Sequence, residues 1–106
     1  MPKPSVSPET EVLGRPTMAP LFRVVLLDDN DHTYDYVIEM LQQIFIFTMI
    51  EGYRHAEELD RTGRTVLIVC ELPEAEFSRD QIHAYGADWR LPRSVGSMSA
   101  VIEPAQ

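Results

Sequence analysis

The 106-residue chain contains a single cysteine and a single lysine. Cys70 alone cannot form an intramolecular disulfide framework or a cysteine-rich zinc site. Seventeen acidic residues outnumber nine basic ones, and the formal charge of −8 argues against binding to nucleic-acid phosphates. No apolar run reaches the roughly 18 residues of a membrane span, and the first residues lack the apolar core of a secretory signal. We therefore expect a cytoplasmic protein that binds neither nucleic acid nor membrane.

The negative charge is concentrated in one segment. Nine acidic residues and one basic residue, Arg54, lie between Asp28 and Asp60, so this segment carries the whole net charge of −8. Elsewhere the acids and bases balance. We therefore look for the functional residues first in this segment.

The chain divides into a tail and one domain. Residues 1–20 hold five of the eight prolines and show no sustained apolar period, which predicts a disordered N-terminal extension. Apolar residues make up 44% of the chain, which is enough for one small core formed by residues 21–106. We assign this second part as a single domain.

Six elements are predicted in residues 21–106. Apolar, β-branched runs predict strands over 21–27, 64–71 and 97–103, the last ending because Pro104 stops pairing. Thr33 is a candidate N-cap for a first helix, and Thr48 with Glu51 forms the capping-box pattern of a second helix that Gly63 closes. Pro73 starts a third helix that ends near Gly86.

This order, β-α-α-β-α-β, has too few crossovers for a doubly wound parallel sheet. The predicted fold class is α+β, a small three-stranded antiparallel sheet packed against helices. Trp89 falls in the loop before the last strand, and we expect it to pack over an edge of the core.

The acidic loop Asp28-Asp29-Asn30-Asp31-His32 lies between the first strand and the first helix, and several interpretations are open. A phospho-receiver domain also has an acidic pair here, but it needs a later lysine and more β-α units than this length supplies. A divalent-metal site could use Asp28, Asn30 and His32, although a glycine is missing from the turn of a calcium loop. The acids could also simply cap the helix and solvate the surface.

A fourth interpretation is a receptor for a primary ammonium group, which offers three hydrogen-bond donors and no acceptor. Carboxylate and amide oxygens of the loop would accept these donors. The two helices could place an apolar pocket beside them, although ordinary core packing explains the same spacing. The candidates on the first helix are Tyr34, Val37 and Met40, and those on the second are Ala56, Leu59 and Asp60.

Two stretches resemble the ClpS adaptor family: residues 22–30, FRVVLLDDN, and residues 36–42, YVIEMLQ. The resemblance covers the chain from Leu21 to about Pro104. It implies a non-enzymatic adaptor without a cofactor, which binds the N-terminal degron residues of substrate proteins. The adaptor delivers those substrates to a Clp AAA+ unfoldase-protease, through the N-terminal domain of ClpA or ClpC. The expected substrates carry a bulky hydrophobic N-terminal residue.

The resemblance also implies roles for individual residues, some of which differ from the usual family residue. Asp60 stands where a histidine is usual, and Tyr34 replaces a gatekeeping methionine. The residues implied to bind the substrate amine are Asp28, Asp29, Asn30 and Asp60. The implied hydrophobic pocket consists of Tyr34, Val37, Met40, Ala56 and Leu59. Glu74 and Arg79 are the implied unfoldase contacts.

Two alternative functions are open. One is a diverged module that keeps the fold and regulates the protease without reading N-degrons. The other is the divalent-metal-binding domain described above. Catalysis is not expected, because the chain shows no Ser-His-Asp pattern and its one cysteine lies in a predicted strand.

Overall fold

The computed structural model describes residues 19–106. Nearly all of the extension predicted at residues 1–20 therefore lies outside the described residues. The elements follow the predicted order, and the α+β fold class is confirmed.

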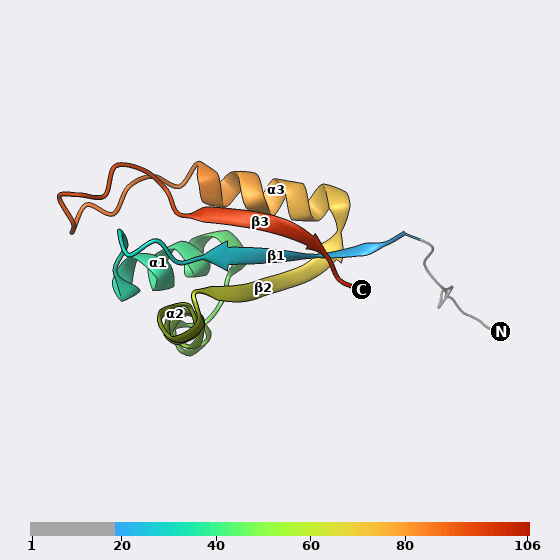
Figure 1. Cartoon of the computed structure of the whole chain (residues 1–106), viewed down its shortest axis with the longest axis horizontal. Coiled ribbons are helices and arrows are strands. Elements are labelled where there is room, and N and C mark those ends of the chain that lie inside the picture. The colour runs from blue at the N-terminus through green and yellow to red at the C-terminus, as the bar shows by residue number, and fades with distance from the viewer. Residues whose placement is uncertain (1–18) are drawn as a thin grey trace.

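The sheet has three antiparallel strands with β1 (Leu21–Leu27) in the centre (Figure 1). One neighbour is β2 (Arg64–Glu71), whose register shifts once, opposite Val24 and Val25. The other neighbour is β3 (Ser99–Pro104). Because side chains alternate along a strand, Val24 and Leu26 face one side of the sheet and Val25 the other.

Three helices pack against the side of the sheet that carries Val24 and Leu26. They are α1 (Tyr34–Phe45), α2 (Met49–Thr62) and α3 (Leu72–His83). Buried residues from all three helices share one core cluster with Val24 and Leu26. Met40, Ala56 and Ile82 represent the three helices in this cluster. The α1–α2 hairpin is therefore fixed to the sheet through a common core.

Local signals set the helix ends, as predicted. The Thr33 side chain accepts a hydrogen bond from Tyr36 N at 3.1 Å and caps α1. At α2, Thr48 N donates to the Glu51 carboxylate at 2.8 Å and Glu51 N donates to Thr48 Oγ1 at 3.1 Å, which completes the capping box. Gly63 closes α2 with φ of 86°, a left-handed conformation that favours glycine.

Three expectations are corrected. Pro104 belongs to β3 and pairs with Phe22, which an edge strand permits because the outer side of such a strand needs no donor. The third helix ends at His83 rather than near Gly86. Trp89 does not pack on the core: it is 82% exposed, and the Arg90 guanidinium lies 4.6 Å from its ring centroid.

None of the helices within residues 19–106 has the length and apolar character needed to cross a membrane.

Candidate functional site

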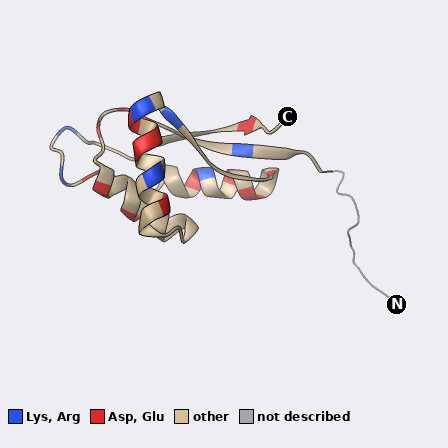
Figure 2. Ribbon diagram, turned by 90° about the horizontal axis from the view of Figure 1, so that it is seen from below, with Lys and Arg blue, Asp and Glu red and all other residues tan. Residues whose placement is uncertain are grey.

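A cavity of about 200 Å³ lies where the β1–α1 loop (residues 28–33) meets the α1–α2 hairpin. The acidic residues of this part of the chain are spread over the same loop and both helices (Figure 2). The cavity is lined by Asp28, Asn30, His32, Thr33, Tyr34, Val37, Ala56, Leu59, Asp60 and Arg93. It combines charged, amide and aliphatic groups from three segments that are distant in the sequence: residues 28–37, residues 56–60 and Arg93.

A backbone hydrogen bond brings the acidic loop to the end of α2. Asp28 N donates to the Gly63 carbonyl at 3.0 Å, immediately after β1 ends. Since Asp60 lies in the last turn of α2, this contact sets the carboxylates of Asp28 and Asp60 on walls of the same cavity. Neither carboxylate forms an ion pair with another residue in the described part of the chain.

Seven of the nine residues expected in the amine site and pocket line this cavity. The other two are Asp29 and Met40. Asp29 directs one carboxylate oxygen at its own loop, where Asp31 N donates to it at 3.0 Å. Met40 is fully buried and shares the core cluster with the cavity residues Val37 and Ala56, so it lies behind the lining.

Tyr34 links the two helices at the cavity. Its hydroxyl, on α1, donates to Asp60 Oδ2, on α2, at 3.0 Å. Its ring makes an edge-on contact with Tyr53, with centroids 5.8 Å apart. Partial burial and the neighbouring Asp60 carboxylate raise the pKa of the Tyr34 hydroxyl, which therefore stays protonated and donates.

His32 connects two loops beside the cavity. Its Nδ1 lies 2.8 Å from Asp29 Oδ1, and its Nε2 lies 2.8 Å from the Gly96 carbonyl oxygen. Only 3% of the side chain is exposed, and the ring packs against Tyr36 with centroids 4.5 Å apart. The β1–α1 loop is thereby fastened to the α3–β3 loop (residues 84–98), which lies at the same end of the sheet (Figure 1).

Asp88 fastens the same two loops a second time. Its buried carboxylate accepts hydrogen bonds from Thr33 N and Oγ1 at 2.7 and 2.8 Å, and from Arg90 N at 3.0 Å. Burial alone would raise the pKa of Asp88, but the hydrogen bonds from Thr33 and Arg90 outweigh it and lower the pKa to about 2. Asp88 is therefore ionised at neutral pH and holds the start of α1.

Arg93 also comes from the α3–β3 loop and is the one lysine or arginine among the residues that line the cavity. Its Nε donates to Asp31 Oδ1 at 3.1 Å, and its Nη2 donates to the Asn30 carbonyl at 2.7 Å. No pattern in the sequence points to Arg93 or to the contact of His32 with Gly96, because more than sixty positions separate the partners.

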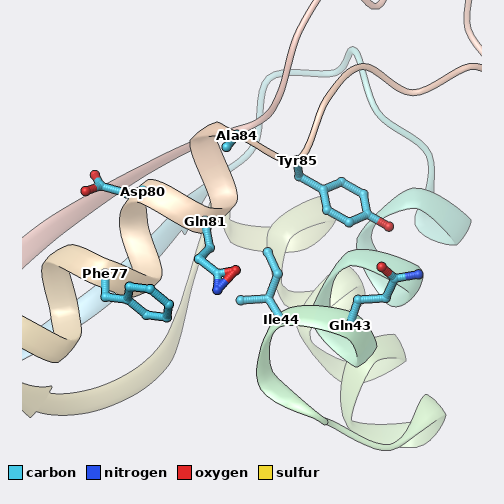
Figure 3. Close-up of a pocket in the computed structure, with 7 residues that line it drawn as sticks. All are labelled: Gln43, Ile44, Phe77, Asp80, Gln81, Ala84 and Tyr85. Carbon is cyan, nitrogen blue, oxygen red and sulfur yellow. The ribbon is translucent and has the colours of Figure 1, made fainter.

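A second, more open cavity of about 520 Å³ lies between α1 and α3. Figure 3 shows Gln43 and Ile44 on the α1 side facing Phe77 and Gln81 of α3, with Tyr85 beyond the end of that helix. Its lining includes none of the residues predicted for amine binding, and the acidic group it contains is Asp80.

A third cavity of about 550 Å³ lies where β2 meets α3. Its lining is mainly apolar, with exposed Val69 and Phe77, and it includes Glu74, one of the two predicted unfoldase contacts. Arg79, the other, does not line it and pairs with Asp80 at 3.1 Å. Five helical positions turn Arg79 by roughly 140° from Glu74, so the two residues lie on different faces of α3.

The described residues hold no group of three or more His, Cys, Asp or Glu side chains arranged to bind a metal ion. Both ring nitrogens of His32 already contact protein oxygens. This geometry gives the metal-binding interpretation of Asp28, Asn30 and His32 no support.

The chain folds as a small α+β domain with a three-stranded antiparallel sheet and three helices. Residues 17–92 match the model of the family described as ATP-dependent Clp protease adaptor protein ClpS. ATP-dependent Clp protease adapter protein ClpS 2 of Agrobacterium fabrum is 31% identical over 91 residues, covering 86% of this chain and 82% of that protein. The chain therefore belongs to the ClpS family of Clp protease adaptors, and the family resemblance is confirmed.

A solved structure agrees with this assignment. ClpS2 of Agrobacterium tumefaciens, bound to L-phenylalaninamide, matches with a TM-score of 0.69 and 26% sequence identity. The match covers 81% of this chain and 98% of the other. ClpS adaptors are non-catalytic partners of Clp AAA+ unfoldases and of their substrates.

Proposed function

We propose that this protein binds the free N-terminus of substrate proteins in the 200 Å³ cavity and delivers those substrates to a Clp AAA+ unfoldase-protease. The observation that carries this proposal is the presence of two carboxylates, Asp28 and Asp60, that have no ion-pair partner among residues 19–106 and lie beside the aliphatic side chains of Val37, Ala56 and Leu59. A bulky hydrophobic N-terminal residue presents the matching groups, a cation next to an apolar side chain.

The amine site follows from the chemistry of the ammonium group. An N-terminal ammonium has three donors and no acceptor, and hydrogen bonds from it to carboxylates are assisted by charge. Asp28 and Asp60 supply carboxylate oxygens, and the Asn30 side-chain amide supplies a neutral one. We include Asp29 in the amine site because its hydrogen bonds within the described residues use only Oδ1.

The pocket is small. Binding sites for drug-sized ligands are roughly 300–1,000 Å³, so a cavity of about 200 Å³ has room for one side chain. Val37, Ala56 and Leu59 are almost fully buried and form a rigid apolar wall, which Met40 supports from behind. Tyr34 lies at the exposed side of this wall and completes the proposed hydrophobic pocket.

The relative solved with L-phenylalaninamide supports the same ligand class. That ligand carries a free α-amino group, an apolar benzyl side chain and an amide carbonyl. A peptide that begins with phenylalanine presents the same three groups in the same arrangement.

We further propose that the N-terminal domain of the unfoldase, ClpA or ClpC, docks on α3 through Glu74 and Arg79. Glu74 borders the cavity between β2 and α3, where exposed Val69 and Phe77 offer apolar contact area. Since Arg79 lies on a different face of α3, a partner that contacts both residues must wrap around the helix.

One observation favours the alternative function, a ClpS-type module that regulates the protease without reading N-degrons. The Tyr34 hydroxyl already donates to Asp60, so the cavity is spanned by an internal hydrogen bond in the unbound protein. On this alternative, unfoldase binding persists while N-terminal peptides do not bind.

Peptide binding separates the two functions. Fluorescent peptides that begin with Leu, Phe, Tyr or Trp are prepared with a free and with an acetylated N-terminus, and their affinities are measured by anisotropy. The proposed function predicts binding of free N-termini only. Equal binding of both forms, or binding of neither, contradicts it.

A further inference from the structure

We propose that Arg93 is a ligand-binding residue of this cavity and that its guanidinium donates to the carbonyl oxygen of the substrate's first residue. This inference rests on the proposed function, because it concerns a peptide N-terminus bound in the same cavity. It adds a second recognised group to the ammonium. The site would then read the first peptide carbonyl as well as the amine and the side chain.

The guanidinium of Arg93 lies against the β1–α1 loop and makes two hydrogen bonds to it. Arg93 Nη2 donates to the Asn30 carbonyl at 2.7 Å, and Arg93 Nε donates to Asp31 Oδ1 at 3.1 Å. These two contacts hold the plane of the guanidinium beside the loop. The residue lines the cavity together with Asp28 and Asn30, so a cationic donor lies next to the proposed acceptors for the ammonium.

An N-terminus has the complementary arrangement. Its ammonium nitrogen and its first carbonyl carbon are bonded to the same Cα. The ammonium donors and the carbonyl acceptor therefore lie next to each other. A surface with carboxylates next to a guanidinium matches this pair. A surface with carboxylates alone matches only the amine.

The guanidinium has donors left for a ligand. Arg carries five N–H donors and no acceptor, and two of them are used in the hydrogen bonds to Asn30 and Asp31. The contact with Asp31 is an ion pair between two well-exposed side chains, which contributes little stability. This ion pair therefore allows the Arg93 side chain to shift slightly toward a ligand at little cost in free energy.

Cavity size places the ligand backbone near Arg93. A cavity of about 200 Å³ takes one side chain, so the backbone of a bound peptide must stay at the rim. The Arg93 side chain is 64% exposed although it lines the cavity, which locates it at that rim. The first carbonyl of the peptide is the acceptor that such a donor meets.

The test uses two amines with the same benzyl group. L-phenylalaninamide has the carbonyl, and phenethylamine lacks it. Both are measured by competition against a fluorescent peptide that begins with phenylalanine, at pH 6, where both amines carry their proton. The protein variants are the wild type, Arg93→Gln and, as a control, Arg54→Gln, which makes the same charge change at a residue that does not line the cavity.

We expect Arg93→Gln to weaken L-phenylalaninamide about tenfold, the low end of the range for a hydrogen bond to a charged group, because the side chain is exposed. Phenethylamine should change less than about twofold, since only the long-range charge differs. Arg54→Gln should change the affinity for either amine by less than about twofold. Melting temperatures of the three proteins should agree, because both arginines are on the surface.

Equal weakening of both amines by Arg93→Gln, or no weakening of either, overturns the role of Arg93. N-acetyl-L-phenylalaninamide, which keeps the carbonyl and loses the charge, separates this failure from failure of the proposed function. If the wild type binds the acetylated compound as tightly as the free amine, or binds none of the three ligands, both proposals are wrong.

Discussion

The carboxylate of Asp88 accepts hydrogen bonds from both the backbone nitrogen and the side-chain hydroxyl of Thr33, at 2.7 and 2.8 Å. Thr33 in turn caps α1, whose residues Tyr34 and Val37 line the cavity. A buried acid that lies 55 positions later in the sequence thus anchors the residue that caps α1. The shape of the proposed binding site depends on this contact.

Replacing Asp88 with alanine should destabilise the protein by about 3 kcal/mol, because the donors of Thr33 and Arg90 lose a buried charged acceptor. Urea denaturation measures the change. Asp80→Ala is the matched control, since Asp80 is an exposed acid that pairs with its neighbour Arg79, and it should change stability by less than about 0.5 kcal/mol. Equal effects of the two substitutions would show that the Asp88 contact is not important for folding.

Acid should remove the contribution of Asp88 over a defined pH range. Its pKa is lowered from 3.8 to about 2 in the folded protein. A folded-state pKa below the unfolded one means that the stabilisation is complete above about pH 4 and is lost as the pH falls toward 2. The shift corresponds to about 2 kcal/mol. The stability difference between wild type and Asp88→Asn, measured from pH 6 to pH 2, should therefore shrink below pH 4, and a constant difference would contradict this assignment.

Tyr34→Phe should strengthen peptide binding by about threefold. The hydroxyl of Tyr34 occupies Asp60 Oδ2 in the unbound protein, and a solvent-exposed hydrogen bond that must be exchanged on binding contributes about 0.7 kcal/mol, which corresponds to threefold. Isothermal titration with a peptide that begins with phenylalanine measures the effect. Tyr53→Phe is the control, because Tyr53 contacts the Tyr34 ring and does not line the cavity. Weaker binding of the Tyr34→Phe variant would mean that the hydroxyl takes part in recognition.

Phe77→Ser should weaken binding to the N-terminal domain of the unfoldase and leave peptide binding unchanged. Phe77 is 66% exposed on α3, away from the 200 Å³ cavity, so its removal should change stability by less than about 1 kcal/mol. Val95→Ser removes another exposed apolar side chain, in the α3–β3 loop, and serves as the control. Pull-down or interferometry with the isolated unfoldase domain compares the two, and an unaltered affinity of Phe77→Ser places the docking surface elsewhere.

Much of the fold could be predicted because its signals are local. The cap at Thr33, the capping box at Thr48 and the left-handed Gly63 are each specified within a few residues, and the strand boundaries of β1 and β2 follow from their apolar runs. The sequence predicts the last strand over residues 97–103, but β3 runs over Ser99–Pro104, since a long loop without a period precedes it. Strand pairing with Phe22, not the local sequence, decides that Pro104 is included.

The site was predictable only in part. The loop and hairpin residues could be found because they are close in sequence and lie on periodic faces of two helices. Met49 and Tyr53 fall at the helical spacing of Ala56 and Leu59, but both are exposed, and Gly52 of the same helix packs against Ile38. Arg93, Asp88 and Gly96 reach the site from a loop more than fifty positions away, which only the tertiary structure reveals.

The central claim is that carboxylates of this cavity read a charged N-terminus, and one ratio tests it most directly. This is the ratio of dissociation constants for an N-acetylated and a free peptide that begins with phenylalanine, measured for the wild type and for the Asp28→Asn, Asp60→Asn double variant. Two charge-assisted hydrogen bonds predict a ratio of about 100 or more in the wild type and a fall of at least about tenfold in the variant. A wild-type ratio near one, or the same ratio in both proteins, would contradict the account.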